Sequence, residues 1–366
     1  MGSVGSERQT VLVLQGGGAL GAYQYGVIQA LHENRIEPNW VIGTSMGAIN
    51  GAIVAGNPAE RRMERLTSFW NRIASSDFGS ESPAAQFWQS LSNLQTLAWG
   101  VPGLFGPNPA SIWGPHFELG IEQASYYSTG PMGQTLRELV DFERIAQSHM
   151  RLTVGAVNAR SGTMKYFDSR HHPLTVEHVL ASGALPPAFP AVRIDGEPYW
   201  DGGIYSNTPM EVVFDDNPRR DALIFDVHLW NPVGPEPRSL LEVQLRQKDI
   251  QYASRFDSHL MRQQQIHRLR HVVSELAQRV APEVADSAEC RALARFGCST
   301  RMHVVRLMAP RLMSEDHAKD IDFSRSGIDA RREAGYQDTC RAVQQQPWDL
   351  PVDPLEGVIV HDFENR

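Results

Sequence analysis

The first part of the chain alternates continuous apolar runs with a stretch of helical periodicity. Residues 10–15 (TVLVLQ) form an apolar run of strand length, and residues 40–42 (WVI) begin a second one. Between them, apolar residues recur at helical spacing from Ala22 to Leu31. Continuous apolar runs are typical of strands buried on both faces of a parallel sheet. The order strand, helix, strand therefore predicts an α/β fold.

The same kinds of segment continue after residue 133. Their periodicity and flanking turn residues predict further elements of an α/β fold. These are a helix over 134–145, strands over 152–157 and 163–167, a helix over 176–180, a hairpin turning at Asp195-Gly196, strands over 222–227 and 302–307, and a last helix over 322–343 that is followed by a tail.

Residues 238–279 predict a long amphipathic helix or a pair of helices, rich in Arg and Gln. His267 and His271 lie four residues apart, on one face of such a helix, but no carboxylate accompanies them in a ligand pattern. We therefore expect both histidines at the solvated surface. The residues expected to face inward are Leu241, Leu245, Ile250, Leu260, Ile266, Leu269, Val273 and Leu276.

Residues 75–133 follow neither a helical nor a strand period. They combine many aromatic residues with prolines, and the aromatic content argues against disorder. We interpret this stretch as a cap inserted into the α/β fold. It is either a structural cover or a lid that contacts an apolar ligand or a lipid surface, where Trp and Tyr are favoured. The candidates for such contacts are Trp99, Phe105 and Trp113.

The composition is that of an ordinary globular protein. The 366 residues carry a formal net charge of −8, which argues against nucleic acid as the main partner. No stretch approaches the ~18 consecutive apolar residues of a membrane span. Residues 1–9 lack the apolar core of a secretory signal and are expected to form a flexible leader. Cys290, Cys298 and Cys340 give no disulfide framework or metal spacing, so we expect a cytoplasmic protein.

Gly43, Ser45 and Gly47 form the pattern G-x-S-x-G at the end of the second predicted strand. This pattern is typical of a nucleophile elbow, in which a serine occupies a sharp turn from strand to helix. Glycines on either side let neighbouring segments pass closely, and the following helix directs its positive end at the serine. The structural alternative is that the serine only caps the N-terminus of a helix, which the same sequence also fits. Ser45 is the candidate nucleophile.

Gly16, Gly17 and Gly18 follow the first predicted strand directly. Together with Gly21 they satisfy G-x-G-x-x-G, the dinucleotide fingerprint. A dinucleotide site also needs an acidic residue where the second strand ends, and that strand ends in G-T-S. The alternative is an oxyanion hole, because consecutive glycines at a helix start leave several backbone N–H groups unpaired.

A serine nucleophile needs a proton acceptor within hydrogen-bonding distance. Asp201 is a candidate, because it follows a predicted strand, precedes two glycines and comes directly after Tyr199 and Trp200, which can desolvate it. An aspartate that only stabilises a D-G-G turn is the structural alternative. Ordinary α/β hydrolases use a late histidine instead. The candidates for that role, none of them in a turn marked by Gly or Pro, are His228, His303, His317 and His361.

Taken together, the three motifs resemble the patatin-like phospholipase family in their order and spacing. They are G-G-G-x-x-G at 16–21, G-T-S-M-G at 43–47 and D-G-G at 201–203. The resemblance covers residues 11–209. Residues 238–366 are similar only to an extension of some bacterial members and carry no catalytic signature.

The resemblance implies a three-layer α/β/α sandwich around a central, mostly parallel sheet. It implies that Ser45 is the nucleophile and that Asp201 is its only catalytic partner. It further implies that Gly16, Gly17 and Gly18 supply the oxyanion hole, and that neither a metal nor another cofactor takes part.

The predicted organisation is a leader over 1–9, a catalytic domain over 10–235 with the cap inserted at 75–133, and a mainly helical C-terminal extension over 236–366 packed on it. The predicted function is hydrolysis of a phospholipid or other lipid ester through an acyl-enzyme, with transient contact with a membrane surface. The alternatives are a His-dependent carboxylesterase and a non-catalytic lipid- or dinucleotide-binding protein on the same scaffold. The oligomeric state stays open, a homodimer being one option.

Overall fold

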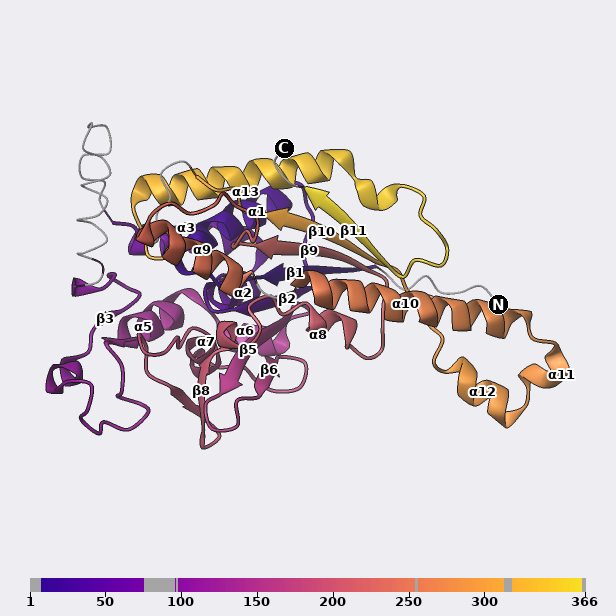
Figure 1. The fold of residues 1–366 in the computed structure, drawn as a ribbon, viewed down its shortest axis with the longest axis horizontal. Coiled ribbons are helices and arrows are strands. Elements are labelled where there is room, and N and C mark those ends of the chain that lie inside the picture. Colours follow the sequence, from indigo (N-terminus) through magenta and orange to yellow (C-terminus); the bar gives the residue numbers. More distant parts are fainter. Residues whose placement is uncertain (1–7, 76–95, 97, 254–255, 313–317, 364–366) are drawn as a thin grey trace.

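A mixed sheet with helices on both faces forms the centre of the molecule (Figure 1). The computed structural model describes residues 8–75, 96, 98–253, 256–312 and 318–363. Within these residues the main sheet has nine strands in the order β11-β10-β9-β1-β2-β5-β8-β7, with β6 also paired to β5. Neighbours from β11 to β5 are parallel, and all pairs that involve β6, β7 or β8 are antiparallel. The strands are β1 (Gln9–Leu14), β2 (Trp40–Thr44), β5 (Arg151–Asn158), β6 (Met164–Asp168), β7 (Val192–Ile194), β8 (Glu197–Asp201), β9 (Ala222–His228), β10 (Met302–Met308) and β11 (Val358–Phe363).

Each face of the sheet has its own hydrophobic core. In β1, Leu12 and Leu14 belong to one core, and Val11 and Val13 belong to the other. Alternate residues of a strand point to opposite faces, so a strand that is apolar throughout must be covered on both sides. Helices α1 and α13 lie side by side over one face, while α8 and α10 cover the other (Figure 1). The predicted three-layer α/β/α sandwich is confirmed.

The helices differ in length, and several are short. The α-helices are α1 (Ala22–Glu33), α2 (Met46–Ala55), α3 (Ala59–Ile73), α5 (Gly130–Leu139), α6 (Phe142–Gln147), α7 (Val176–Ser182), α8 (Glu211–Phe214), α9 (Leu240–Tyr252), α10 (Phe256–Arg279), α11 (Pro282–Ala285), α12 (Ala288–Ala294) and α13 (Arg325–Gln345). The 3-10 helices are η1 (Gly18–Gly21), η2 (Pro109–Trp113), η3 (Gly202–Ile204) and η4 (Pro347–Asp349).

The described part of the predicted cap lies beside the sheet and has little regular structure. Its only ladder among the described residues is the two-stranded pair of β3 (Gly106–Pro107) and β4 (Tyr127–Ser128). Residues 76–95 and 97, which also fall within the predicted cap, lie outside the described residues. No helix in the described part of the chain is both long enough and apolar enough to cross a bilayer.

The end of the C-terminal part departs from its prediction. The segment after residue 343 was expected to be a tail, but it contains β11, which pairs in parallel with β10. Since β10 in turn pairs with β9, the sheet continues from residues 10–235 into residues 236–366 without a break. The two predicted regions therefore share one sheet.

The prediction for His267 and His271 is wrong, because both side chains are buried. His267 packs against Phe214, and the two ring nitrogens of His271 face backbone carbonyls at 3.1 and 2.8 Å. Leu260 is also buried, and the side chain of Gln264 donates to the β11 carbonyl at 358. Positions 260, 264, 267 and 271 form one stripe along α10.

This stripe also corrects the inward-facing residues predicted for the region. Leu245 and Leu260 are buried as expected. Leu269 is 65% exposed, because it lies off the buried stripe. The other expected inward residues that are exposed are Leu241, Ile250 and Leu276. The buried face of α10 is partly polar, so a pattern of apolar residues alone misplaces it.

Candidate active site

Ser45 occupies a strained turn between β2 and α2. Its φ angle is +55°, a positive value that is uncommon for residues other than glycine. The space around the turn requires glycine on both sides. A Cβ atom on Gly43 would lie 2.3 Å from the carbonyl oxygen of Gly47, and one on Gly47 would lie 2.2 Å from the carbonyl oxygen of Leu14. The predicted nucleophile elbow therefore has the expected backbone geometry.

The sheet brings Asp201 to the same edge as Ser45. Thr44, the last residue of β2, pairs with Gly155 of β5, and the next β5 residue, Ala156, pairs with Asp201 at the end of β8. The register of β5 therefore places residues 45 and 201 close together, although they are far apart in sequence.

Burial dominates the electrostatics of Asp201. Its side chain is 3% exposed, and this desolvation raises the pKa of the carboxyl to about 7. Hydrogen bonds from the amide of Gly203, at 2.7 Å, and from the hydroxyl of Ser45 oppose the increase. A pKa near neutrality is well matched to a general base at neutral pH.

The histidines of the alternative triad lie elsewhere. His228 is buried, with Nε2 2.6 Å from a carboxylate oxygen of Asp226. His303 and His361 stack on each other across β10 and β11, with 3.1 Å between ring nitrogens. None of these three lines the cavity at Ser45. His317 lies outside the described residues.

The glycine loop contains two amides for which the described residues provide no acceptor. The amide of Gly16 donates to the carbonyl of Asn207 at 3.4 Å, and that of Ala19 donates to the carbonyl of Asp320 at 2.9 Å. Between them, the amides of Gly17 and Gly18 have no acceptor in the part of the chain that the structure describes. Both residues line the cavity that contains Ser45.

This cavity has a volume of about 270 Å³. Ser45, Asp201 and the glycine loop lie in its wall, and most of the remaining wall is apolar. Phe105 belongs to that wall, where its ring contacts those of Tyr127 and Phe189 at centroid distances of 5.0 and 5.2 Å. The other apolar residues of the wall include Ile49, Leu104, Met132 and Leu185.

The three aromatic residues that the sequence grouped together have different environments. Phe105 is buried in the cavity wall. Trp99 and Trp113 are 78% and 68% exposed and are not among the described residues that line the cavity. Trp113 stacks on Phe117, which is also exposed, with ring centroids 5.6 Å apart.

Several residues of the cavity wall carry no sequence signal. Tyr252 comes from the end of α9, and Asp320, Ile321 and Phe323 come from the loop before α13. Trp230, two residues after the end of β9, also lines the cavity. The C-terminal region therefore forms part of the candidate site. Among the described residues, no group of three or more His, Cys, Asp or Glu side chains is placed to hold a metal ion.

Comparison with known proteins extends this picture. A "cGAMP-activated phospholipase" of Pseudomonas aeruginosa is 26% identical over 232 residues, which are 58% of this chain and 60% of that protein. A "patatin-like phospholipase domain-containing protein" of Aspergillus terreus is 32% identical over 92 residues, which are 25% of this chain and 13% of that protein. The chain therefore spans only part of the length of these relatives.

Among solved structures, VipD from Legionella pneumophila is similar over 93% of this chain and 67% of its own, with 16% identity and a TM-score of 0.40.

Two family models match the sequence. One, described as patatin phospholipase, covers residues 250–355 of the C-terminal region. The other, described as patatin-like phospholipase, covers residues 12–214, which is more than half of the chain and includes all three motifs. The chain therefore belongs to the patatin-like phospholipase family.

Proposed function

We propose that the protein is a serine-dependent lipid acyl hydrolase that works through a Ser45–Asp201 dyad. The observation that carries this proposal is the position of the two side chains in one largely apolar cavity, beside two backbone amides that have no acceptor among the described residues. The site thus holds a nucleophile, a buried base and oxyanion donors, which are the parts that acyl transfer requires.

In the proposed acylation step, the Asp201 carboxylate accepts the hydroxyl proton of Ser45 while the serine oxygen attacks the ester carbonyl. The amides of Gly17 and Gly18 stabilise the oxyanion of the tetrahedral intermediate. The intermediate collapses to an acyl-enzyme, and the alcohol leaves with the proton from Asp201. Water then attacks the acyl carbon while the same carboxylate accepts its proton, and Asp201 returns this proton to the Ser45 oxygen as the acid is released.

The chemistry of the cavity favours a long acyl chain over a small polar substrate. Its wall beyond the dyad is built by Leu104, Phe105, Met132 and Phe189, side chains that gain free energy from contact with hydrocarbon. Two curated relatives have the names "cGAMP-activated phospholipase" and "Lysophospholipase nte1", which agree with a lipid ester as substrate.

Transient binding to a membrane surface is the second part of the proposal. The exposed rings of Trp99, Trp113 and Phe117 provide apolar contact with the bilayer. The net charge of −8 does not favour binding to anionic lipid, so the affinity must come from this apolar contact. On this basis the protein acts from the aqueous side of a membrane.

A fluorophosphonate probe tests the proposed nucleophile. The probe should label the wild-type protein at Ser45, as located by peptide mass spectrometry, and should not label Ser45→Ala. Wild type should also release acid from p-nitrophenyl butyrate and from phosphatidylcholine vesicles, whereas Ser45→Ala should not. An unlabelled, inactive wild type would indicate a binding protein instead. Labelled Ser45 with full activity in Asp201→Asn would instead favour the His-dependent esterase.

A further inference from the structure

The carbonyl oxygen of Gly16 accepts two side-chain hydrogen bonds. The indole Nε1 of Trp230 donates at 2.8 Å, and the amide Nδ2 of Asn207 donates at 3.1 Å. Both donors are buried, so neither bond is exchanged readily for one to water. The orientation of this carbonyl is therefore fixed from two sides.

Fixing the Gly16 carbonyl also fixes the next N–H group. A peptide unit is planar and trans, so its C=O and N–H bonds point in opposite directions. The N–H of this unit belongs to Gly17, which lines the cavity and whose amide has no acceptor among the described residues. Rotation of the peptide would move this donor away from its position and would break both bonds to Gly16.

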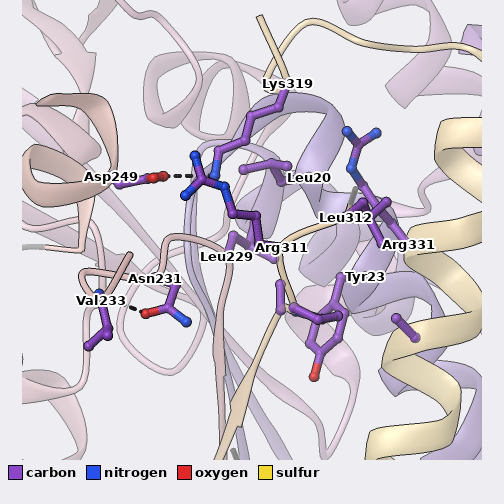
Figure 2. Close-up of a pocket in the computed structure, with 13 residues that line it drawn as sticks. Leu20, Tyr23, Leu229, Asn231, Val233, Asp249, Arg311, Leu312, Lys319 and Arg331 are labelled. Atoms are coloured by element: carbon purple, nitrogen blue, oxygen red, sulfur yellow. Dashed lines mark hydrogen bonds and ion pairs between the residues drawn. The ribbon is translucent and has the colours of Figure 1, made fainter. Parts of the chain in front are cut away.

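Trp230 is itself held in place from several directions. Its backbone N–H donates to the side-chain oxygen of Gln15 at 3.1 Å. Its ring lies 4.9 Å from the ring of Tyr252, measured between centroids, and Lys319 Nζ lies 5.2 Å from its centroid. Lys319 is in turn held by Asp249 at 2.7 Å, as the dashed line in Figure 2 shows. Three of these residues belong to the C-terminal region.

Backbone contacts join the same region to the loop. The carbonyl of Tyr252, the last residue of α9, accepts hydrogen bonds from the side chains of Gln15 and Asn207, each at 3.1 Å. Gln15 directly precedes Gly16 in the chain. The end of α9 therefore contacts Gln15, which precedes the loop, Asn207, which bonds to the Gly16 carbonyl, and the ring of Trp230.

We propose that Trp230 and Asn207 are positioning residues that hold the Gly17 amide in the orientation required to bind the oxyanion. Neither residue takes part in proton transfer or covalent bonding. This inference rests on the proposed function, and it assigns to the C-terminal region the role of stabilising the oxyanion loop through Tyr252 and Lys319.

The test uses Trp230→Phe, which keeps an aromatic ring but removes the N–H donor, and Asn207→Leu, which removes the second donor. The oxyanion forms in both acylation and deacylation, so kcat should fall whichever step limits turnover. With p-nitrophenyl butyrate we expect kcat to fall roughly tenfold in each variant, with KM changed less than about twofold. Trp348→Phe is the matched control, because Trp348 is a buried residue of the core beside Phe225.

An inhibitor separates positioning from packing. An alkyl trifluoromethyl ketone adds to a serine and forms an oxyanion, whereas the alcohol of the same chain length does not. In both variants the Ki of the ketone should rise by about the factor by which kcat falls, and the Ki of the alcohol should stay within about twofold. The acid limb of the pH–rate profile should not move, because Asp201 is untouched.

If wild-type activity depends on Ser45 and folded Trp230→Phe has an unchanged kcat, this inference is overturned while the proposed function stands. If Trp230→Phe does not fold, the same measurements on Asn207→Leu test the inference. A parallel loss of affinity for ketone and alcohol would show that the two residues only pack against the site, and would overturn the inference. A wild type with no esterase activity, or an active Ser45→Ala variant, would overturn the proposed function together with the inference.

Discussion

The backbone N–H of Ser45 donates a hydrogen bond of 3.0 Å to the hydroxyl oxygen of Ser182. The Ser182 hydroxyl in turn donates to the carbonyl of Gly155 at 2.6 Å. Ser182 is the last residue of α7 and is fully buried, so one side chain links the strained turn to α7 and to β5. A residue with φ of 55° needs such support, because the conformation is disfavoured by itself.

Replacing Ser182 with Ala should therefore destabilise the protein and impair the elbow. The substitution leaves the partly buried amide of Ser45 and the buried carbonyl of Gly155 without this partner, so the free energy of unfolding should fall by about 1–3 kcal/mol. We also expect kcat to fall, since the serine oxygen is held less firmly. Ser68→Ala is the control, because its hydroxyl donates to the Glu64 carbonyl within the same helix, α3. Urea unfolding followed by circular dichroism measures the difference, and equal effects of the two variants would contradict the assignment.

The dyad predicts that its two members act as one unit. Ser45→Ala and Asp201→Asn should each lower ester hydrolysis by orders of magnitude, and the double variant should be little worse than either single one. His361→Ala should retain most activity, as should His228→Asn, which keeps a donor for the buried Asp226. Steady-state kinetics on p-nitrophenyl butyrate decide the matter. A histidine variant as inactive as Asp201→Asn would replace the dyad with a triad.

The environment of Asp201 predicts the pH dependence of activity. Only the carboxylate form accepts the Ser45 proton, and burial raises the pKa of this group to about 7. The value of kcat/KM should therefore rise as pH increases through about 7 and then level off, in a profile measured from about pH 5 to about pH 9. Activity that stays constant down to about pH 5 would show that the base is ionised there and would contradict the assignment.

The same carboxyl should lower the stability of the fold at neutral pH. Its pKa rises from 3.8 to about 7 on folding, so the folded state binds the proton more tightly than the unfolded state. Its stabilising contribution is present below about pH 4 and is lost as pH rises through about 7. Asp201→Asn should therefore be more stable than wild type above about pH 7, with an upper bound of about 4 kcal/mol from three pKa units.

Thermal melting at a series of pH values measures this difference. Asp195→Asn, in the exposed hairpin turn, is the matched control, because the substitution is chemically the same and the side chain is exposed. The advantage of Asp201→Asn over wild type should shrink as the pH falls towards about 4. A variant that is less stable than wild type at pH 8 would mean that the carboxylate stabilises the fold, contrary to this expectation.

The aromatic residues of the cap predict two separable effects. Trp99→Ala and Trp113→Ala should reduce hydrolysis of phosphatidylcholine vesicles while leaving hydrolysis of p-nitrophenyl butyrate near the wild-type rate, since both rings are exposed. Phe105→Ala should impair hydrolysis of long-chain esters even without a membrane, and it should lower the melting temperature. Equal loss on vesicles and on the soluble ester in the tryptophan variants would remove the membrane contact from the proposal.

Local sequence determined much of the fold and all of the motifs. The apolar runs predicted strands that correspond to β1, β2, β5, β9 and β10, since a strand buried on both faces needs no polar positions. G-x-S-x-G predicted a tight turn, and the clashes that a Cβ atom would make at Gly43 and Gly47 explain why only glycine fits there. Such requirements act over a few residues and can therefore be identified without the rest of the molecule.

Tertiary structure decided which distant residues contact these motifs. The buried face of α10 is the one that contacts β11, and β11 is a strand because it pairs with β10. The sequence alone therefore placed His267 at the surface and the β11 residues in a tail. Trp230 and Tyr252 reach the glycine loop only through the order and register of the strands and the packing of α9. Hydrogen bonds between residues more than 200 positions apart leave no periodic signal, because they depend on the geometry of the whole sheet rather than on the neighbours of either residue.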